Sequence, residues 1–196
     1  MVNNGSSGSK YEGLEFVLSL PTIDHVLSEV KKFGKGSNIA KIDISHAFKH
    51  VPIDPKDINY LGVFWGAYYV EKRLVSGFRN GSTFFQCIAQ FIRLILTSEG
   101  HNFLAYIDDF LIFGNEAQCD KAFVRLNALL EELGFDISHH KTVAPATEVV
   151  CLGILVNTKN FTLSVPTEKL SEIKNLLKNW QYTTSCTKNQ LQSIVY

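Results

Sequence analysis

Residues 103–113 read Phe-Leu-Ala-Tyr-Ile-Asp-Asp-Phe-Leu-Ile-Phe, two apolar runs interrupted by two adjacent acids. Each run has the length and composition of a buried strand. Two carboxylates inside such a segment would repel each other and lose solvation if both were buried. A turn between the strands would bring Asp108 and Asp109 to one end of a sheet. An ordinary hairpin turn and a metal site both fit this pattern.

A third acid lies in another apolar segment. Asp43 belongs to the run Lys41-Ile-Asp-Ile44. If the two segments form neighbouring strands, Asp43 and Asp108 converge at one end of the sheet. Carboxylates placed in this way can hold two Mg²⁺ ions about 3.5–4 Å apart, the spacing used for in-line phosphoryl transfer. Because Mg²⁺ prefers oxygen ligands and keeps water or substrate phosphate in its shell, a few carboxylates suffice.

The segments around these acids alternate between helix and strand patterns. Helical spacing of apolar residues predicts an α+β, two-layer fold of the split β-α-β (ferredoxin-like) type. Helices are expected over 21–33, 82–98, 116–133 and 168–180, with a further helix starting at 187–190. Strands are expected over 39–44 and 103–113, in a hairpin over 60–74, and as two strands over 148–165 around a turn at 157–160.

The composition is that of a globular chain. Of 196 residues, 45% are hydrophobic and 19% charged, and 19 basic residues balance 19 acidic ones. A net charge of zero argues against a free-standing nucleic-acid binder, which normally carries excess Lys and Arg. Four separated cysteines indicate an intracellular protein, in either cytoplasm or nucleus. No apolar run is long enough for a membrane span, and residues 1–14 form a polar leader without a signal-peptide pattern.

Five short motifs in order resemble those of reverse transcriptases. Asp43-Ile-Ser-His-Ala-Phe48 resembles motif A, and Tyr106-Ile-Asp-Asp109 resembles motif C. Residues 74–82 resemble motif B, and Leu133-Gly-Phe together with Lys141 resembles motif D. Leu152-Gly-Ile-Leu resembles motif E. Details such as Val51-Pro-Ile-Asp-Pro55 are similar to retrotransposons that carry a tyrosine recombinase. The resemblance implies a polymerase palm and an RNA-directed DNA polymerase activity.

The resemblance also implies roles for single residues. Asp43 and Asp108 would ligate two Mg²⁺ ions, with Mn²⁺ as the alternative, helped by the backbone carbonyl of Ile44, and Asp109 would be the supporting acid. Phe48 would be the steric gate that excludes ribonucleotides, although its spacing also fits a core aromatic. Lys141 would donate a proton to pyrophosphate; an ordinary loop lysine is the alternative.

Motif B is the least regular of the five. Ser76, Gly77 and Arg79 would line the nucleotide or template pocket, and the absence of a side chain at Gly77 allows close backbone approach. A solvated surface arginine fits Arg79 equally well. Val75 and Ser82 stand where the family usually has proline. A catalytically inactive relic that binds RNA or protein is therefore the second interpretation of the sequence. A nucleotide cyclase is a third interpretation, but a cyclase requires a Gly-Gly-Asp/Glu turn in place of Tyr-Ile-Asp-Asp.

By the same resemblance the chain divides into a partial fingers region (15–38), a palm (39–165) with a fingers-like hairpin insertion (50–74), and a truncated start of the thumb or connection (166–196). The expected partners are an RNA or DNA template-primer and deoxynucleoside triphosphates. The missing thumb and RNase H regions of a longer polyprotein would complete the enzyme, and no membrane partner is expected.

Overall fold

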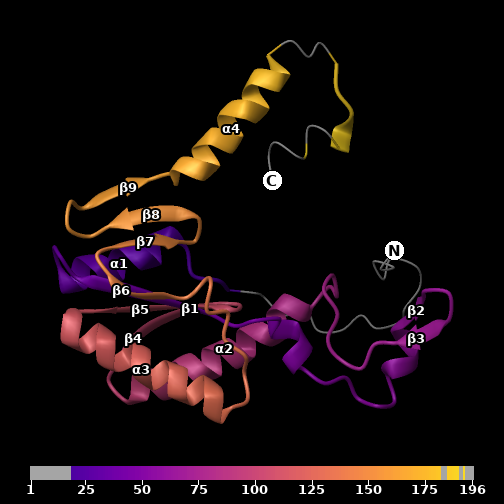
Figure 1. Cartoon of the computed structure of the whole chain (residues 1–196). Coiled ribbons are helices and arrows are strands. Elements are labelled where there is room, and N and C mark those ends of the chain that lie inside the picture. Colours follow the sequence, from indigo (N-terminus) through magenta and orange to yellow (C-terminus); the bar gives the residue numbers. More distant parts are fainter. Residues whose placement is uncertain (1–18, 182–184, 190–191, 193–196) are drawn as a thin grey trace.

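The computed structural model describes residues 19–181, 185–189 and 192. Helices and strands alternate along the chain as the periodicity predicts (Figure 1). The helices are α1 (Ile23–Phe33), α2 (Gly81–Ser98), α3 (Glu116–Glu132) and α4 (Thr167–Trp180). The strands are β1 (Asn38–Asp43), β2 (Gly62–Phe64), β3 (Tyr68–Val70), β4 (Asn102–Tyr106), β5 (Asp109–Gly114), β6 (Val143–Ala146), β7 (Glu148–Cys151), β8 (Ile154–Asn157) and β9 (Thr162–Ser164).

The central sheet has the strand order β4-β5-β1-β6, and every neighbouring pair in it is antiparallel. Along the chain the same elements follow as β1-α2-β4-β5-α3-β6. Each helix thus connects two strands that are separated in the sheet by a third strand, which defines the split β-α-β arrangement. The predicted α+β palm fold is confirmed.

Helices α2 and α3 cover one face of this sheet (Figure 1). Strand side chains alternate between the faces, so Ile42 on β1 and Phe110 on β5 point into the same core. The two helices contribute residues at helical spacing, for example Phe85 and Leu126, both fully buried. This core fixes β1 and β5 side by side, which is what brings the acids of the two strands together.

The opposite face is covered by α1 and by the small sheet of β7, β8 and β9. Val26 and Val30 of α1 pack there with Ile39 of β1 and Leu111 of β5. The central strands β1 and β5 are therefore buried on both faces, which explains their near-continuous apolar sequence. Asp43, Asp109 and Lys41 are exceptions to that rule.

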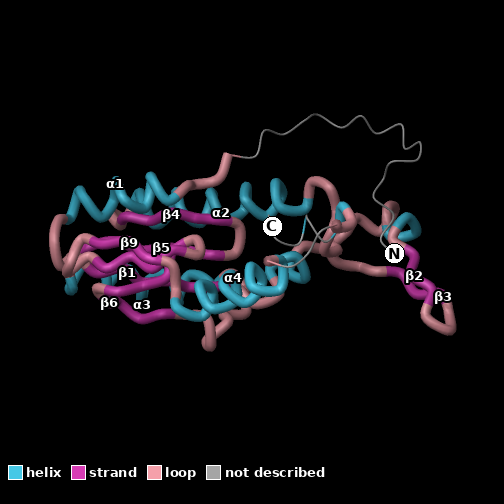
Figure 2. The backbone as a smooth tube through the Cα atoms, turned by 90° about the horizontal axis from the view of Figure 1, so that it is seen from above, coloured by secondary structure: helices cyan, strands magenta, loops and turns pink. Residues whose placement is uncertain are grey.

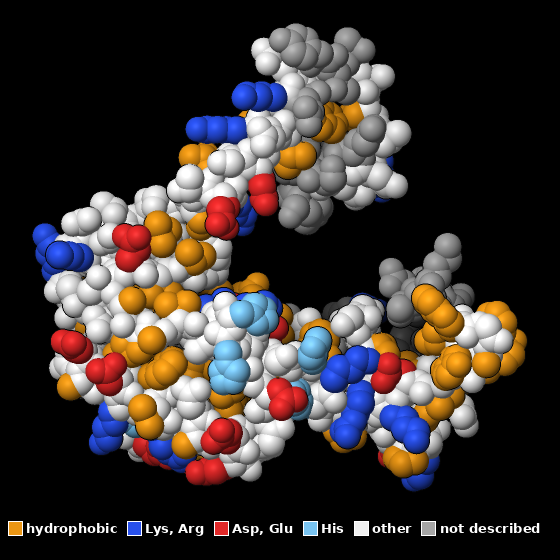
Figure 3. All heavy atoms as spheres, in the orientation of Figure 1, with side chains coloured by type: hydrophobic (Ala, Val, Ile, Leu, Met, Phe, Trp, Pro, Cys, Tyr) orange, Lys and Arg blue, Asp and Glu red, His pale blue; other side chains and the backbone are white. Residues whose placement is uncertain are grey.

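Two parts extend from the body. The β2–β3 hairpin projects to one side (Figure 2), and its side chains are exposed, Trp65 by 83% and Tyr68 by 87%. Helix α4 rises from the β7–β9 sheet, away from the layer of α2 and α3 (Figure 1), and the surface is hollowed between α4 and the body (Figure 3). None of the helices in the described part of the chain is long and apolar enough to cross a membrane.

The expectation of two strands over 148–165 is wrong, because the structure has three there, and β6 was not expected at all. The additional strand arises at Leu152 and Gly153, which adopt φ values of 49° and 81°. Two successive residues with positive φ make the tight turn that pairs β7 with β8. The helix expected from 187–190, and the leader over 1–14, fall partly or wholly outside the described residues.

Candidate active site

Asp43 and Asp109 lie directly opposite each other on neighbouring strands. Asp43 is the last residue of β1 and Asp109 the first of β5, and the antiparallel register pairs the two. Residues that are opposite in an antiparallel pair project from the same face with Cβ atoms about 4.5–5.5 Å apart. The register therefore brings two carboxylates together at one end of the sheet, on the face that also holds α1 and β7.

Asp108 belongs to the two-residue turn that joins β4 to β5. Ile107, the first residue of this turn, has a φ of 55°, a left-handed conformation that a β-branched residue rarely adopts. The carbonyl oxygen of Asp108 accepts a hydrogen bond of 3.0 Å from the N–H of Ile44, just past the end of β1. This bond ties the turn to the neighbouring strand and holds Asp108 beside Asp43.

The environment disfavours the charged form of two of these acids. Burial raises the pKa of Asp108 above its ordinary value, and the nearby Asp43 carboxylate raises it further. Burial likewise raises the pKa of Asp109, while Lys41 opposes the shift and Asp43 adds to it. The cause is the one expected of carboxylates that share a site, because desolvation and like charge both favour protonation. A bound cation would reverse this effect.

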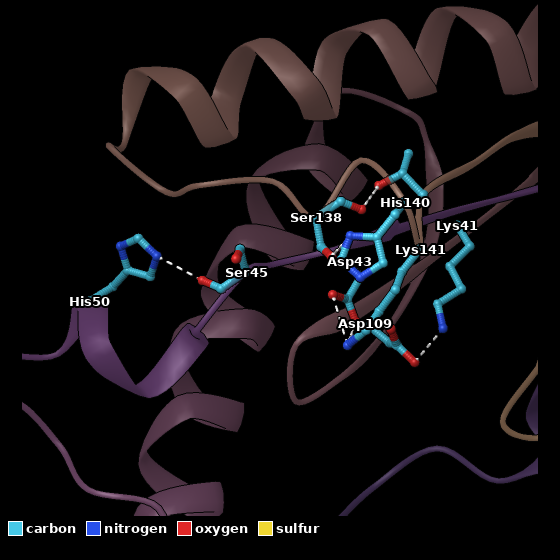
Figure 4. Close-up of polar contacts among 9 residues, drawn as sticks. Lys41, Asp43, Ser45, His50, Asp109, Ser138, His140 and Lys141 are labelled. Atoms are coloured by element: carbon cyan, nitrogen blue, oxygen red, sulfur yellow. Dashed lines mark hydrogen bonds and ion pairs between the residues drawn. The ribbon is translucent and has the colours of Figure 1, made fainter.

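Two lysines face the acids (Figure 4). The Nζ atom of Lys141 lies 3.4 Å from Oδ1 of Asp43, and that of Lys41 lies 2.8 Å from Oδ2 of Asp109. Lys141 sits in the loop after α3, where the N–H of Ser138 donates to the carbonyl of Asp43 at 2.8 Å. The structure thus brings the predicted residues Asp43, Asp108, Asp109 and Lys141 together.

Lys41 was not foreseen as part of the site, although a signal for it exists. It lies two residues before Asp43 in β1, and residues i and i+2 of a strand project from the same face. Its side chain is only 19% exposed. A lysine on the buried face of a central strand needs an anionic partner nearby, and Asp109 supplies it.

The donor set fits a hard divalent cation. Carboxylate oxygens are the ligands that Mg²⁺ and Mn²⁺ prefer. Oδ1 of Asp109 is buried without a hydrogen-bond partner, so its lone pairs are free to coordinate a cation. Within the described residues no group of three or more His, Cys, Asp or Glu side chains is arranged so that it could hold a metal ion by itself. Mg²⁺ does not need one, because it usually keeps waters and substrate phosphate in its shell.

Phe48 lies in a short 3₁₀ helix (Ala47–His50) that follows β1. Its half-buried ring packs edge-on against Phe85 of α2, with centroids 6.1 Å apart. One side of the ring therefore belongs to the core, as the alternative interpretation of Phe48 as a core aromatic requires. Ile44, whose backbone was expected to help bind metal, is buried at 1% exposure between Asp43 and this helix.

The residues that resemble motif B belong to a different loop from the acids. Ser76, Gly77 and Arg79 sit in the loop between β3 and α2, and all three are exposed. Gly77 has a φ of 89°, and a Cβ atom built there would meet nothing within 4 Å. The glycine is therefore required by the backbone conformation, while the space beside it is open.

The fold and the acidic end of its sheet define a palm-type polymerase domain. A family model described as "Reverse transcriptase (RNA-dependent DNA polymerase)" matches residues 13–156. The chain belongs to this family. A comparison with curated proteins found no match.

Several solved structures are similar in fold. A foamy viral protease-reverse transcriptase in complex with double-stranded DNA superposes with a TM-score of 0.70 at 21% identity, over 91% of this chain and 29% of that one. A foamy viral protease-reverse transcriptase with an RNA/DNA hybrid gives a TM-score of 0.64 at 24% identity, over 81% of this chain and 20% of that one. The chain therefore spans between a fifth and a third of the length of these structures.

Proposed function

We propose that this chain is the palm of an RNA-directed DNA polymerase that extends a primer from deoxynucleoside triphosphates by two-metal phosphoryl transfer. The observation that carries the proposal is the meeting of Asp43, Asp108 and Asp109 at one sheet end, in a chain of the reverse transcriptase family. One buried and two half-buried acids placed together are costly for folding alone, and a cation that binds there offsets the cost.

In this proposal Asp43 and Asp108 hold two divalent ions, Mg²⁺ or Mn²⁺, with help from the carbonyl of Ile44, and Asp109 supports them. The ions would polarise the transferred phosphoryl group and neutralise its charge. The chain itself mainly positions the reactants, as is general for phosphoryl transfer. Lys141, whose Nζ already lies beside Asp43, is placed to protonate the departing pyrophosphate.

Phe48 is the proposed steric gate. Its contact with Phe85 anchors the ring, and the ring remains half-exposed. An anchored ring can exclude a 2′-hydroxyl more sharply than a mobile one, because it cannot yield without disturbing the core. Ser76, Gly77 and Arg79 are proposed to contact the nucleotide or template from the loop before α2.

The proposed partners are an RNA or DNA template-primer and deoxynucleoside triphosphates, and the similar foamy viral structures include complexes with double-stranded DNA and with an RNA/DNA hybrid. The proposed division is into fingers (15–38), palm (39–165, with the 50–74 insertion) and the start of the thumb (166–196). The hollow between α4 and the body is where we place the nucleic acid (Figure 3). We assign the chain to the retrotransposons that carry a tyrosine recombinase, on motif details alone.

Primer extension tests the proposal. The chain, joined to fingers and thumb regions that complete such a polymerase, should incorporate deoxynucleotides on an RNA template when Mg²⁺ is present. Asp108→Asn should abolish incorporation, whereas Asp120→Asn on the exposed side of α3 should not. Incorporation that survives Asp108→Asn would contradict the site assignment.

A second candidate is a non-catalytic module that binds RNA or protein. The observation that favours it is the replacement of the usual motif B prolines by Val75 and Ser82. This candidate predicts template-primer binding without Mg²⁺-dependent extension, and equal binding by the wild type and by Asp108→Asn.

A further inference from the structure

Gln86 is a buried polar side chain that faces the turn of the candidate site. It lies in the second turn of α2 and is 4% exposed. Its Nε2 donates to the carbonyl of Ala105 at 2.9 Å, and its Oε1 accepts from the N–H of Ile107 at 2.6 Å. One amide group therefore bridges the backbone on both sides of Tyr106, at the point where β4 ends.

Strand β4 needs such a bridge because it is an edge strand. In the sheet order β4-β5-β1-β6 it has a neighbour on one side only. The outward backbone groups of an edge strand have no ladder partner, and leaving them unpaired when buried is costly. The Gln86 amide offers one donor and one acceptor side by side, as a neighbouring strand would. It extends the hydrogen-bonded ladder by one link.

The hydrogen bond to Oε1 of Gln86 is donated by Ile107, the residue whose backbone conformation defines the turn. Ile107 adopts a φ of 55° although its side chain is β-branched. Such a conformation persists only where the surroundings hold it. Two hydrogen bonds meet this requirement here. Gln86 fixes the N–H of Ile107 from the helix side, and Ile44 fixes the carbonyl of Asp108 from the β1 side.

We infer that Gln86 is a positioning residue, which holds the Ile107–Asp108 turn so that the Asp108 carboxylate stays beside Asp43. It does not touch the cation or the substrate; it acts through the backbone of the turn. The role toward the metal rests on the function proposed above. The role toward the turn does not, because it follows from the two hydrogen bonds alone.

The test compares Gln86→Met with Gln90→Met. Both glutamines lie on α2, one helical turn apart, and the side chain of Gln90 accepts a hydrogen bond from Arg93 of the same helix. Methionine keeps the length of the side chain and removes both amide bonds. Two quantities are measured on the folded chain, the hydrogen-exchange rate of the Ile107 amide and the affinity for Mn²⁺ by electron paramagnetic resonance.

We expect Gln86→Met to speed exchange at Ile107 about tenfold or more, while amides in α3 keep their rates. The Mn²⁺ affinity should fall by roughly tenfold, the loss typical when a group that orients a ligand is removed. Gln90→Met should change neither. Unchanged exchange and affinity in Gln86→Met, or equal changes in Gln90→Met, would overturn the inference.

Gln86→Glu serves if Gln86→Met does not fold. A glutamate keeps the acceptor for the Ile107 N–H and loses the donor to Ala105, so exchange at Ile107 should remain slow; fast exchange there contradicts the inference. The two proposals fail separately. If the wild type binds no Mn²⁺, the proposed function is wrong, while the exchange rate at Ile107 still decides whether Gln86 holds the turn.

Discussion

Replacing Lys41 by methionine removes the ammonium group beside Asp109 and keeps the apolar stem of the side chain. In the wild type Nζ of Lys41 lies 2.8 Å from Oδ2 of Asp109, and the two side chains are 19% and 20% exposed. The other oxygen of Asp109 has no hydrogen-bond partner. The variant therefore leaves a mostly buried carboxylate unpaired, with Asp43 directly opposite.

The expected cost follows from this geometry. A hydrogen bond to a charged group contributes about 1.5–3 kcal/mol, and breaking a fully buried pair costs about 3–5 kcal/mol. Because a fifth of each side chain reaches solvent, the lower range applies, and we expect Lys41→Met to lower the free energy of unfolding by about 2 kcal/mol. The double variant Lys41→Met/Asp109→Asn should recover about 1.5 kcal/mol of this loss, since no unpaired charge remains.

Urea unfolding in the presence of a chelator measures the effect. With a slope of about 2 kcal/mol per molar urea, the midpoint should fall by roughly 1 M. Lys121→Met on the exposed side of α3 is the matched control and should leave the midpoint unchanged. Loss of Lys41 should also raise the pKa of Asp109 further, so the destabilisation should be smaller at pH 4 than at pH 7. If the double variant loses as much free energy of unfolding as Lys41→Met and Asp109→Asn lose in sum, the reasoning is refuted.

Three further outcomes are expected. Asp108→Asn should raise the free energy of unfolding of the metal-free chain by about 1 kcal/mol at pH 7, because the raised pKa of Asp108 means that its charged form costs stability above that pKa. The gain should disappear as urea titrations move below pH 3.8, the ordinary carboxyl value, and a gain independent of pH would contradict the cause given. Phe48→Ala should raise the ratio of ribonucleotide to deoxynucleotide incorporation in primer extension, and an unchanged ratio in an active enzyme would remove the gate role. Gly114→Ala should cost about 1–3 kcal/mol in urea unfolding, because a Cβ atom there would lie 2.9 Å from that of Gln118, whereas Gly62→Ala, with nothing within 4 Å, should be neutral.

The elements around the site were predictable because their signals are local. The apolar runs on either side of Asp108 and Asp109 determine both strands and the turn between them. Helical spacing of residues such as Phe85 and Leu126 gives the covering helices. The sequence also indicates Asp43, since an acid inside a strand-like apolar run stands out on its own.

The parts that were missed depend on pairing between distant segments. The partner of Lys41 is known only once β1 and β5 are in register, with Asp43 opposite Asp109. Gln86 bonds to Ala105 and Ile107 across the gap between a helix and a strand, and the helical pattern around it gives no sign of this. The extra strand β7 depends on the positive φ of Leu152, a conformation that leucine rarely adopts.

Mn²⁺ binding by the chain tests the central claim most directly. Electron paramagnetic resonance should show Mn²⁺ bound to the wild type and displaced by Mg²⁺. Binding should be lost in Asp43→Asn and in Asp108→Asn, and retained in Asp120→Asn, whose side chain lies on the exposed face of α3. Mn²⁺ bound equally by the wild type and by Asp108→Asn would contradict the assignment of the metal site to the acids at the end of β1 and in the β4–β5 turn.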